Sequence, residues 1–510
     1  MSRRSAMLLV MPGLLLQLSV LACARPSPGE PPPPPPGTRT GWYVRTTGTP
    51  QGNGSDTLPW SLQYALDGAA INPGDTLWIR GGDYVGTFYS SLTGSSAAPI
   101  IVSAYPGERV TLTTNSLSNE QFTVDGSWVN YWGLEIVNTN TTRTGDMLGV
   151  RPTGVYVQNA HDLKFINFVV HDAGHGTYTE PDAGNIEIYG WIVYNGGHQW
   201  VGSRSDGHGL YVKNLATAGK KIFRDNVIFD QFGFGIHGYT GSGSSGKLQH
   251  MVFEGNVSFN NSTTSDDVNP NFQIGGDNIA NFDTVRNNLF YFSPSATTDY
   301  NVRVGYPGGP LDSVAVFRDN YVVNGNPAVE VSDWTDLKML NNTFIGSAMM
   351  TRQLDGTPSP AQNWAGNMFY RDPAATAWRF NGSNLNFATW KTNTSLSATD
   401  NAVAGTPSAP FVMVRPHQYL PGAAMVAIVN WGGAATVPVS LAGIGLSTGL
   451  QFEVRNVMNL WGSPVLTGTY TGAAVNFPMS AVAPPLPIGG SPHPPITPGP
   501  QFNVFIVRKL

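Results

Sequence analysis

The chain has 510 residues, of which 41% are apolar and only 12% are charged, and its formal net charge is −5. The apolar share is enough for a large buried core, and the net negative charge argues against a protein that binds nucleic acid. The 59 glycines, together with many Val, Ile, Phe and Tyr residues, favour β structure.

Residues 1–22 have the pattern of an export signal. A basic "MSRR" precedes the apolar "AMLLVMPGLLLQLSVLA", which is too short for a comfortable membrane span. The segment ends in "VLAC", and Cys23 is the one cysteine of the chain. This ending resembles a bacterial lipoprotein signal, which implies a lipid on Cys23. The alternative is an ordinary secretory signal that happens to contain a cysteine.

Both alternatives predict a location outside the cytoplasm, either on the outer membrane or as a periplasmic or secreted protein. The lipid anchor would be the only contact with the membrane. Residues 23–40 follow as a proline-rich tether with six consecutive prolines. Such a run favours an extended polyproline II conformation and serves as a stiff spacer.

From residue 41 onward a strand-rich unit repeats, with an apolar pair of short strands around a small polar turn. One turn position recurs at steps of 24, 35, 30, 32, 32, 22 and 25 residues, at Asn167, Trp191, Asn226, Asn256, Asn288, Asn320, Asn342 and Asn367. A period in this range without helical periodicity indicates a solenoid, whose units bury their apolar faces by stacking. Asparagine at one corner of each turn predicts a ladder of amide hydrogen bonds, and asparagine also tolerates a left-handed backbone.

These asparagine turns, and the opening "GDTLWIRGGDYVG" at 74–86, resemble right-handed parallel β-helix proteins of the pectate-lyase-like superfamily. The resemblance implies an all-β fold, with a right-handed parallel β-helix over residues 41–397. Residues 398–510 instead show short alternating strands with Gly/Pro turns every 8–12 residues, which predicts a small antiparallel β-sandwich. We expect the sandwich to cap or pack against the solenoid; binding of a glycan is the alternative.

A further short strand lies between successive ladder positions, in "GLYVK", "GIHGY", "NFQIG", "NVRVG" and "AVEVS". Side chains of a strand alternate between its two faces, and the second and fourth positions are apolar or glycine. The third positions therefore face outward, and stacking predicts one row about 20 Å long from Tyr211, His237, Gln273, Arg303 and Glu330. Such a row above a shallow groove suits an extended polymer, although a plain polar surface is the alternative.

We predict catalytic roles for His208, Lys213, His237, Arg303 and Glu330. We predict substrate contacts for Tyr156, His175, Asp206, Tyr211, Tyr239, Gln273 and Asp333. Aromatic rings stack on sugars, an arginine binds a carboxylate, and lysine or histidine transfers protons.

The resemblance implies a polysaccharide lyase, which cleaves a uronate-containing polymer by β-elimination. A glycoside hydrolase in the same groove is the second hypothesis, and it needs two carboxylates about 5–10 Å apart, for which Glu330 and Asp333 are candidates. A non-catalytic glycan-binding surface protein is the third. No cofactor is indicated by the residues themselves; the resemblance allows Ca²⁺. We expect a monomer whose partner is the polysaccharide.

Overall fold

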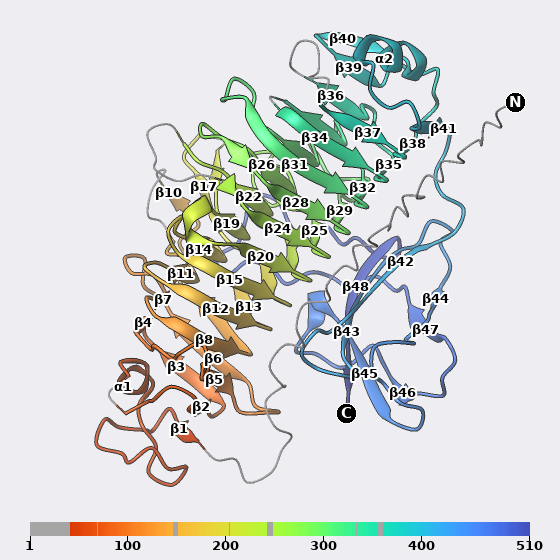
Figure 1. The fold of residues 1–510 in the computed structure, drawn as a ribbon. Coiled ribbons are helices and arrows are strands. Elements are labelled where there is room, and N and C mark those ends of the chain that lie inside the picture. Colours follow the sequence, from red (N-terminus) through yellow and green to blue (C-terminus); the bar gives the residue numbers. More distant parts are fainter. Residues whose placement is uncertain are drawn as a thin grey trace, which may run out of the picture.

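The computed structural model describes residues 41–510 except 69, 146–150, 203, 242–247, 333 and 354–360. The predicted signal, tether and lipidated Cys23 lie outside the described residues, and so does Asp333. The described chain forms a long solenoid of strands and a separate antiparallel unit (Figure 1). This confirms the predicted all-β class. Within the described part, no helix has the length and apolar character needed to cross a bilayer.

Each coil of the solenoid contributes one strand to each of three sheets, and all neighbouring strands are parallel except the last pair of the third sheet. The first sheet contains β1 (Trp42–Val44), β2 (Thr76–Ile79), β5 (Ile100–Ala104), β8 (Ser127–Trp132), β12 (His161–Ile166), β15 (Gly184–Tyr189), β20 (Lys221–Arg224), β24 (Met251–Glu254), β28 (Asp283–Arg286), β31 (Asp312–Arg318), β34 (Trp334–Leu340) and β37 (Asn363–Ala365). The second contains β3 (Gly82–Val85), β6 (Val110–Thr114), β9 (Leu134–Asn138), β13 (Val169–His171), β16 (Ile192–Tyr194), β21 (Val227–Phe229), β25 (Val257–Phe259), β29 (Leu289–Tyr291), β32 (Tyr321–Val323), β35 (Thr343–Ile345), β38 (Met368–Tyr370) and β41 (Asn401–Val403). The third contains β4 (Phe88–Ser90), β7 (Phe122–Val124), β11 (Val155–Val157), β14 (Thr177–Thr179), β19 (Leu210–Val212), β22 (Ile236–Gly238), β26 (Phe272–Ile274), β30 (Val302–Val304), β33 (Val329–Val331), β36 (Thr351–Gln353), β39 (Trp378–Phe380) and β40 (Ser383–Leu385).

The antiparallel unit consists of a five-stranded and a two-stranded sheet around its own apolar core. The larger sheet has the order β42 (Phe411–Pro416), β43 (Ala424–Val429), β48 (Phe502–Lys509), β45 (Gln451–Asn456), β46 (Leu466–Thr469), and the smaller one pairs β44 (Thr436–Val439) with β47 (Val475–Pro478). The remaining elements are α1 (Leu62–Leu66), α2 (Phe387–Thr394), the 3-10 turns η1 (Ala216–Ala218) and η2 (Val457–Asn459), and the short strands β10 (Thr144–Gly145), β17 (His198–Trp200), β18 (Ser205–Asp206), β23 (Leu248–Gln249) and β27 (Ala280–Asn281).

The predicted asparagine ladder is present between the first and second sheets. Its rungs are Asn226, Asn256, Asn288, Asn320, Asn342 and Asn367, and it ends on Asp400. Asn288 illustrates one rung: its Oδ1 accepts from the main-chain N–H of Asn256 at 2.8 Å and from the Asn256 amide at 3.0 Å, while its own amide donates to the Phe253 carbonyl. The rungs are at most 2% exposed, so they satisfy buried main-chain groups that water cannot reach.

Two details of the predicted ladder are wrong: Asn167 is not one of its rungs, and the rung residue is not the one with the left-handed backbone. Asn167 is not a rung, because the strand register aligns Ile166 with Tyr189 and so places Phe168 beside Trp191, where the rings stack at 5.0 Å. Asn167 instead shares its column with Gly190, and both have a left-handed backbone, with φ of 57° and 67°. The left-handed residue is therefore the one before each rung, where Gly, Asn and Asp are the residues that adopt it readily.

The antiparallel unit packs on the outer face of the second sheet and not on an end of the solenoid (Figure 1). Phe411 stacks on Tyr321 at 3.9 Å, and Phe502 stacks on Tyr291 at 4.2 Å. The second sheet continues to β41, beyond the predicted boundary at residue 397, before β42 begins the antiparallel unit. The unit therefore packs against the solenoid, as one of the predictions for it states.

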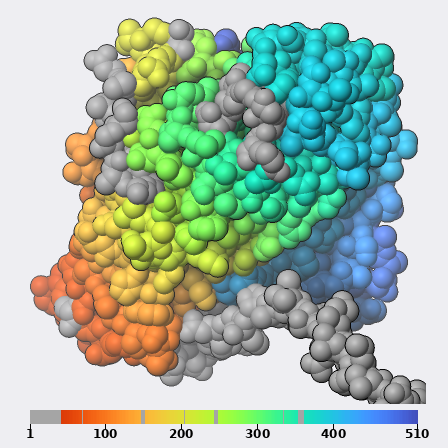
Figure 2. Space-filling model, turned by 45° about the horizontal axis from the view of Figure 1, so that its top comes forward, coloured from red at the N-terminus to blue at the C-terminus, as the bar shows by residue number. Residues whose placement is uncertain are grey.

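Helices cover the ends of the solenoid. The apolar side chains of α1, including Leu62 and Leu66, and those of α2, including Phe387 and Trp390, belong to the solenoid core. They protect strand edges that would otherwise pair with other chains. In the space-filling view the coils follow one another as bands from orange through green to cyan, with the blue antiparallel unit at one side (Figure 2).

His171 lies in a network that joins the solenoid to the antiparallel unit. Its Nδ1 is 2.8 Å from Asp172 Oδ2 and its Nε2 is 3.3 Å from Glu135 Oε1. The same two carboxylates accept hydrogen bonds from the Trp461 indole and from the main-chain N–H of Ile488, both in the C-terminal unit. Burial opposes the charged imidazole, but the hydrogen bonds to the two carboxylates outweigh it and raise the pKa of His171.

This raised pKa predicts a pH-dependent stability. A group with a pKa above its unfolded value stabilises the fold fully below the unfolded pKa, and loses that contribution as the pH rises through the folded pKa. The free energy of unfolding should therefore fall between about pH 6 and about pH 9 in the wild type, and fall less in His171→Gln. Urea unfolding at both pH values measures this, and an equal fall in the two proteins would contradict it.

Candidate functional site

The middle residues of the third-sheet strands form one continuous row. Strand pairing aligns Tyr211 with His237, then Gln273, Arg303 and Glu330, as the sequence alignment predicts. The row continues in both directions, with Tyr178 and Tyr156 before Tyr211, and Arg352 and Arg379 after Glu330. Residues far apart in the sequence thus line one face, about 4.8 Å apart from coil to coil.

The predicted solvent exposure of this row is wrong in its centre. His237, Gln273 and Glu330 are 6%, 1% and 0% exposed. The His237 ring stacks on Phe234 at 3.8 Å and on Tyr239 at 5.1 Å, and these aromatic neighbours exclude water from it. Tyr239, for which a substrate contact is predicted, is itself partly exposed and packs one face of its ring against His237.

A chain of hydrogen bonds occupies the second half of the row. Arg303 Nε donates to Glu330 Oε1 at 2.6 Å, and Arg303 Nη1 lies 3.5 Å from Gln273 Oε1. With its oxygen toward Arg303, the Gln273 amide presents its NH₂ to His237 Nε2 at 3.2 Å. His237 Nε2 then accepts a hydrogen bond and is not available as a base at that atom.

This arrangement connects Arg303, Glu330 and His237, the residues for which catalytic roles are predicted, through ion pairs and hydrogen bonds that include Gln273. Glu330 is buried between Arg303 and Arg352, so its carboxylate is committed to two ion pairs and cannot serve as one of the two acids of a hydrolase. The Arg303 guanidinium lies 3.8 Å over the Tyr300 ring. Removing one residue of these ion pairs would leave a buried charge without a partner. The ion-paired residues therefore stabilise this face of the third sheet.

The first half of the row is an aromatic platform with one lysine. The Tyr156 and Tyr178 rings stack at 5.7 Å, and the Tyr178 and Tyr211 rings meet edge-on at 5.0 Å. Lys213 Nζ donates to the Tyr178 hydroxyl at 2.8 Å and lies 5.2 Å from the centre of the Tyr211 ring. Tyr156, Tyr178, Tyr211 and Lys213 are all partly exposed.

Burial changes the protonation of this platform. It lowers the pKa of Lys213, which the neighbouring Glu180 only partly offsets. It raises the pKa of Tyr178 and of Tyr211, so both hydroxyls keep their protons at neutral pH. A lysine with a lowered pKa beside two protonated hydroxyls is a set of groups suited to proton transfer.

A pocket of about 330 Å³ opens beside the platform. It is lined by Tyr156, Gln158, Asn159, Glu180, Pro181, Asp182 and Leu215. The Tyr156 hydroxyl donates to Glu180 Oε1 at 2.7 Å. The contact predicted for Tyr156 thus falls at a pocket with an aromatic wall and polar side chains, which suits a sugar ring.

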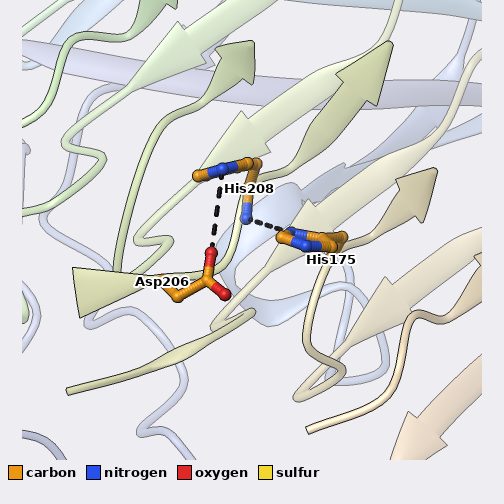
Figure 3. A group of neighbouring side chains, drawn as sticks. All are labelled: His175, Asp206 and His208. Atoms are coloured by element: carbon orange, nitrogen blue, oxygen red, sulfur yellow. Dashed lines mark hydrogen bonds and ion pairs between the residues drawn. The ribbon is translucent and has the colours of Figure 1, made fainter. Parts of the chain in front are cut away.

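His175, Asp206 and His208 come together next to the platform (Figure 3). His175 and His208 occupy equivalent positions in adjacent coils, two residues before β14 and β19, and their rings stack at 4.8 Å. Asp206 ends β18, where the Gly207 N–H donates to its Oδ1 at 2.8 Å. His208 Nε2 lies 3.8 Å from the same oxygen.

The electrostatics of this cluster follow from its burial. Burial and the neighbouring His175 lower the pKa of His208 to about 3. Burial alone would raise the pKa of Asp206, but the neighbouring histidines and the hydrogen bond from the Gly207 N–H outweigh it and lower that pKa. At neutral pH the cluster therefore combines a carboxylate with a neutral His208. A buried His208 of this kind does not fit the predicted role of a general acid or base near pH 7.

Calcium does not suit this cluster. Among the residues that the structure describes, it is the one group of three or more His, Cys, Asp and Glu side chains close enough to share a metal ion. Calcium takes about 6–8 oxygen ligands, whereas this group supplies two imidazoles and one carboxylate. These three side chains therefore do not match the Ca²⁺ that the family resemblance allows.

Distance along the row separates the two halves. Lys213 follows β19 and Arg303 lies in β30, and two strands, β22 and β26, lie between them. Three steps correspond to about 14 Å, which is more than one sugar ring spans. The catalytic roles predicted for Lys213 and Arg303 therefore fall on different sugars of an extended chain.

The fold and this outward row define a parallel β-helix protein with a side-chain platform on one sheet. The family described as "Pel9A-like, right handed beta helix region" matches residues 42–296, which is half of the chain, and the protein belongs to this family. The membership confirms the right-handed parallel β-helix. No curated protein matched the sequence.

Several solved structures are similar to this chain. A GH136 lacto-N-biosidase from Eubacterium ramulus is 15% identical with a TM-score of 0.45, over 72% of this chain and 68% of that one. A rhamnogalacturonan lyase is 15% identical with a TM-score of 0.45, over 71% and 87%. The pectate lyase Pel9A is 17% identical with a TM-score of 0.40, over 72% and 78%.

Proposed function

We propose that the protein is an extracytoplasmic polysaccharide lyase that cleaves a uronate-containing polymer by β-elimination on the third sheet. The observation that carries the proposal is the contact between Lys213 Nζ and the Tyr178 hydroxyl on a partly exposed aromatic platform. Membership in the Pel9A-like β-helix family supports the scaffold on which this platform lies. The row of Tyr156, Tyr178 and Tyr211 would stack successive sugars of an extended chain.

In this mechanism the neutral Lys213 amine removes the proton from C5 of a uronate. The electron pair of that bond forms the C4–C5 double bond, and the C4–O bond to the next sugar breaks. The leaving oxygen takes a proton from one of the two tyrosine hydroxyls, while the other donates a hydrogen bond to the uronate carboxylate. The Lys213 ammonium then returns the abstracted proton to the tyrosinate, so that both groups regain their starting protonation, and the raised pKa of Tyr178 and Tyr211 keeps both donors protonated beforehand.

A panel of acidic and neutral polysaccharides tests the proposal. The lyase should produce an ultraviolet-absorbing unsaturated product together with new reducing ends, on a uronate polymer and not on neutral ones. New reducing ends without that absorbance would indicate a hydrolase. Retention on a glycan affinity gel with neither signal would indicate a non-catalytic binding protein. Both of these results would reject the lyase.

We further propose that residues 1–22 are an export signal and that Cys23 carries a lipid anchor. We also propose that the exported protein is a monomer. A labelled fatty acid should be incorporated into the wild type and not into Cys23→Ser. Release of both proteins in soluble form, without label, would reject the anchor and leave the ordinary secretory signal.

A further inference from the structure

The kind of ligand that His175, Asp206 and His208 can bind depends on which nitrogen of each imidazole carries the proton. The main-chain N–H of His208 donates to His175 Nδ1 at 3.1 Å, and the main-chain N–H of Phe234 donates to His208 Nδ1 at 3.3 Å. The same contact thus repeats from one coil to the next. Because Nδ1 accepts in both rings, the ring proton of each imidazole is on Nε2.

This tautomer opposes a metal ion at the Nε2 atoms. A metal needs a lone pair on the coordinating nitrogen, and the other ring nitrogen of a metal ligand usually donates its proton to an acceptor. Here each Nδ1 faces a main-chain N–H, which is a donor. Metal binding through Nε2 would move both protons to Nδ1 and break both main-chain hydrogen bonds.

The spacing of the three side chains leads to the same conclusion. Tetrahedral zinc with bonds of about 2.0–2.2 Å holds its donor atoms about 3.4 Å apart. The distance from His208 Nε2 to Asp206 Oδ1 is 3.8 Å, and the potential ligand atoms of all three residues lie within 4.8 Å of one another. Three atoms that each form a hydrogen bond of about 2.8 Å with one bridging oxygen atom can lie up to about 4.8 Å from one another.

We infer that His175, Asp206 and His208 form a site for a hydroxyl group of the sugar, not for a metal ion. The hydroxyl donates its proton to the Asp206 carboxylate and accepts from the His208 Nε2–H, while the His175 ring stacks on His208 at 4.8 Å. A contact of 3.8 Å is too long for a direct hydrogen bond and fits one bridged by an oxygen atom. Asp206 remains 26% exposed at its side chain, so the ligand can reach it. The identity of the ligand as a sugar rests on the proposed function.

The position of this site gives it a role beside Lys213. His208 is three residues before Tyr211, and its ring meets the Tyr211 ring edge-on at 5.0 Å. His175 also contacts the Tyr211 ring, at 5.3 Å. A sugar stacked on this tyrosine would present a hydroxyl to the cluster while its C5 faces the amine. The cluster then orients the sugar, and transfers no proton in the elimination.

Nitrogen NMR tests the inference without any turnover. In ¹⁵N-labelled full-length protein, long-range ¹H–¹⁵N correlations distinguish the two tautomers, and His175→Gln and His208→Gln assign the signals. We expect the Nε2–H pattern for both rings, unchanged by ZnCl₂ or CaCl₂. An Nδ1–H pattern, or zinc binding that Asp206→Ala abolishes, would overturn the inference in favour of a metal centre.

Glycerol serves as the probe for the hydroxyl group. Glycerol at high concentration should shift the His175 and His208 signals in the wild type and in Asp67→Ala, a control at an exposed acid far along the chain, but not in Asp206→Ala. Dimethoxyethane, which has no hydroxyl proton to donate, should leave them in place. No shift with glycerol would overturn the hydroxyl site. Because neither measurement uses a polysaccharide, a failed lyase assay would leave this result unaffected.

Discussion

Lys213→Met is expected to lower kcat/KM on the cleaved polymer by about 10³-fold, within the range that a positioned general base contributes. The substitution keeps the length and apolar stem of the side chain and removes the amine that contacts the Tyr178 hydroxyl. Circular dichroism and the unfolding midpoint should remain near those of the wild type, since Lys213 is partly exposed and its side chain forms no ion pair with any residue that the structure describes. Initial rates by ultraviolet absorbance measure the loss.

Two further substitutions separate a base from a simple positive charge. Lys213→Arg keeps the charge, but a guanidinium does not lose its proton near neutral pH, so it should be almost as inactive as Lys213→Met. Lys220→Met removes an exposed lysine of the following turn and should retain full activity.

The pH profile gives an independent test of Lys213. Because burial lowers the pKa of Lys213 and the neutral amine is the base, activity should rise with pH through that lowered pKa. Full activity in Lys213→Arg would show that a charge suffices, and the lysine would then bind the uronate carboxylate without removing a proton.

Asn288→Ala is expected to destabilise the solenoid by about 4 kcal/mol, as several buried hydrogen-bonding groups lose their partners together. The main-chain N–H and the amide of Asn256 would lose their acceptor, and the Phe253 carbonyl would lose its donor. The Asn320 oxygen would also lose the amide that donates to it. Urea unfolding followed by tryptophan fluorescence measures the change.

Asn476→Ala is the matched control for the ladder. Asn476 is an exposed asparagine of β47 in the C-terminal unit, so its removal should change the unfolding free energy by less than about 0.5 kcal/mol. Equal effects in Asn288→Ala and Asn476→Ala would mean that the rungs contribute no more than surface asparagines do.

The fold could be predicted from the sequence because every coil has the same buried corner, which requires the same type of residue. A buried corner needs its main-chain groups satisfied, and asparagine does this with one acceptor and one donor, which makes Asn226 to Asn367 recognisable. The same logic aligned Tyr211, His237, Gln273, Arg303 and Glu330. A second, shorter series of asparagines is not recognisable from the sequence, because only two coils carry it: the Asn261 amide donates to Asn271 within one coil, and the Asn271 amide donates to Asn301 in the next.

The site was harder to predict because register does not determine what covers a side chain. His237 and Glu330 point away from the solenoid core, yet Phe234 and Arg352, from a turn and from a neighbouring strand, bury them. One available signal was missed: "HGTY" at 175–178 and "HGLY" at 208–211 repeat the same four-residue pattern in adjacent coils. This repeat places Tyr178 on the platform, and the two histidines in equivalent positions.

The ladder also bears on how such a protein can change over evolution. Successive rungs are separated by 30, 32, 32, 22 and 25 residues of sequence, yet each is one hydrogen bond from the next. The segments between strands can therefore gain or lose ten residues without disturbing the stacking of the coils. The loops around the platform can change in length while Tyr178, Tyr211 and Lys213 keep their positions. Substrate preference can therefore diverge long before the scaffold does.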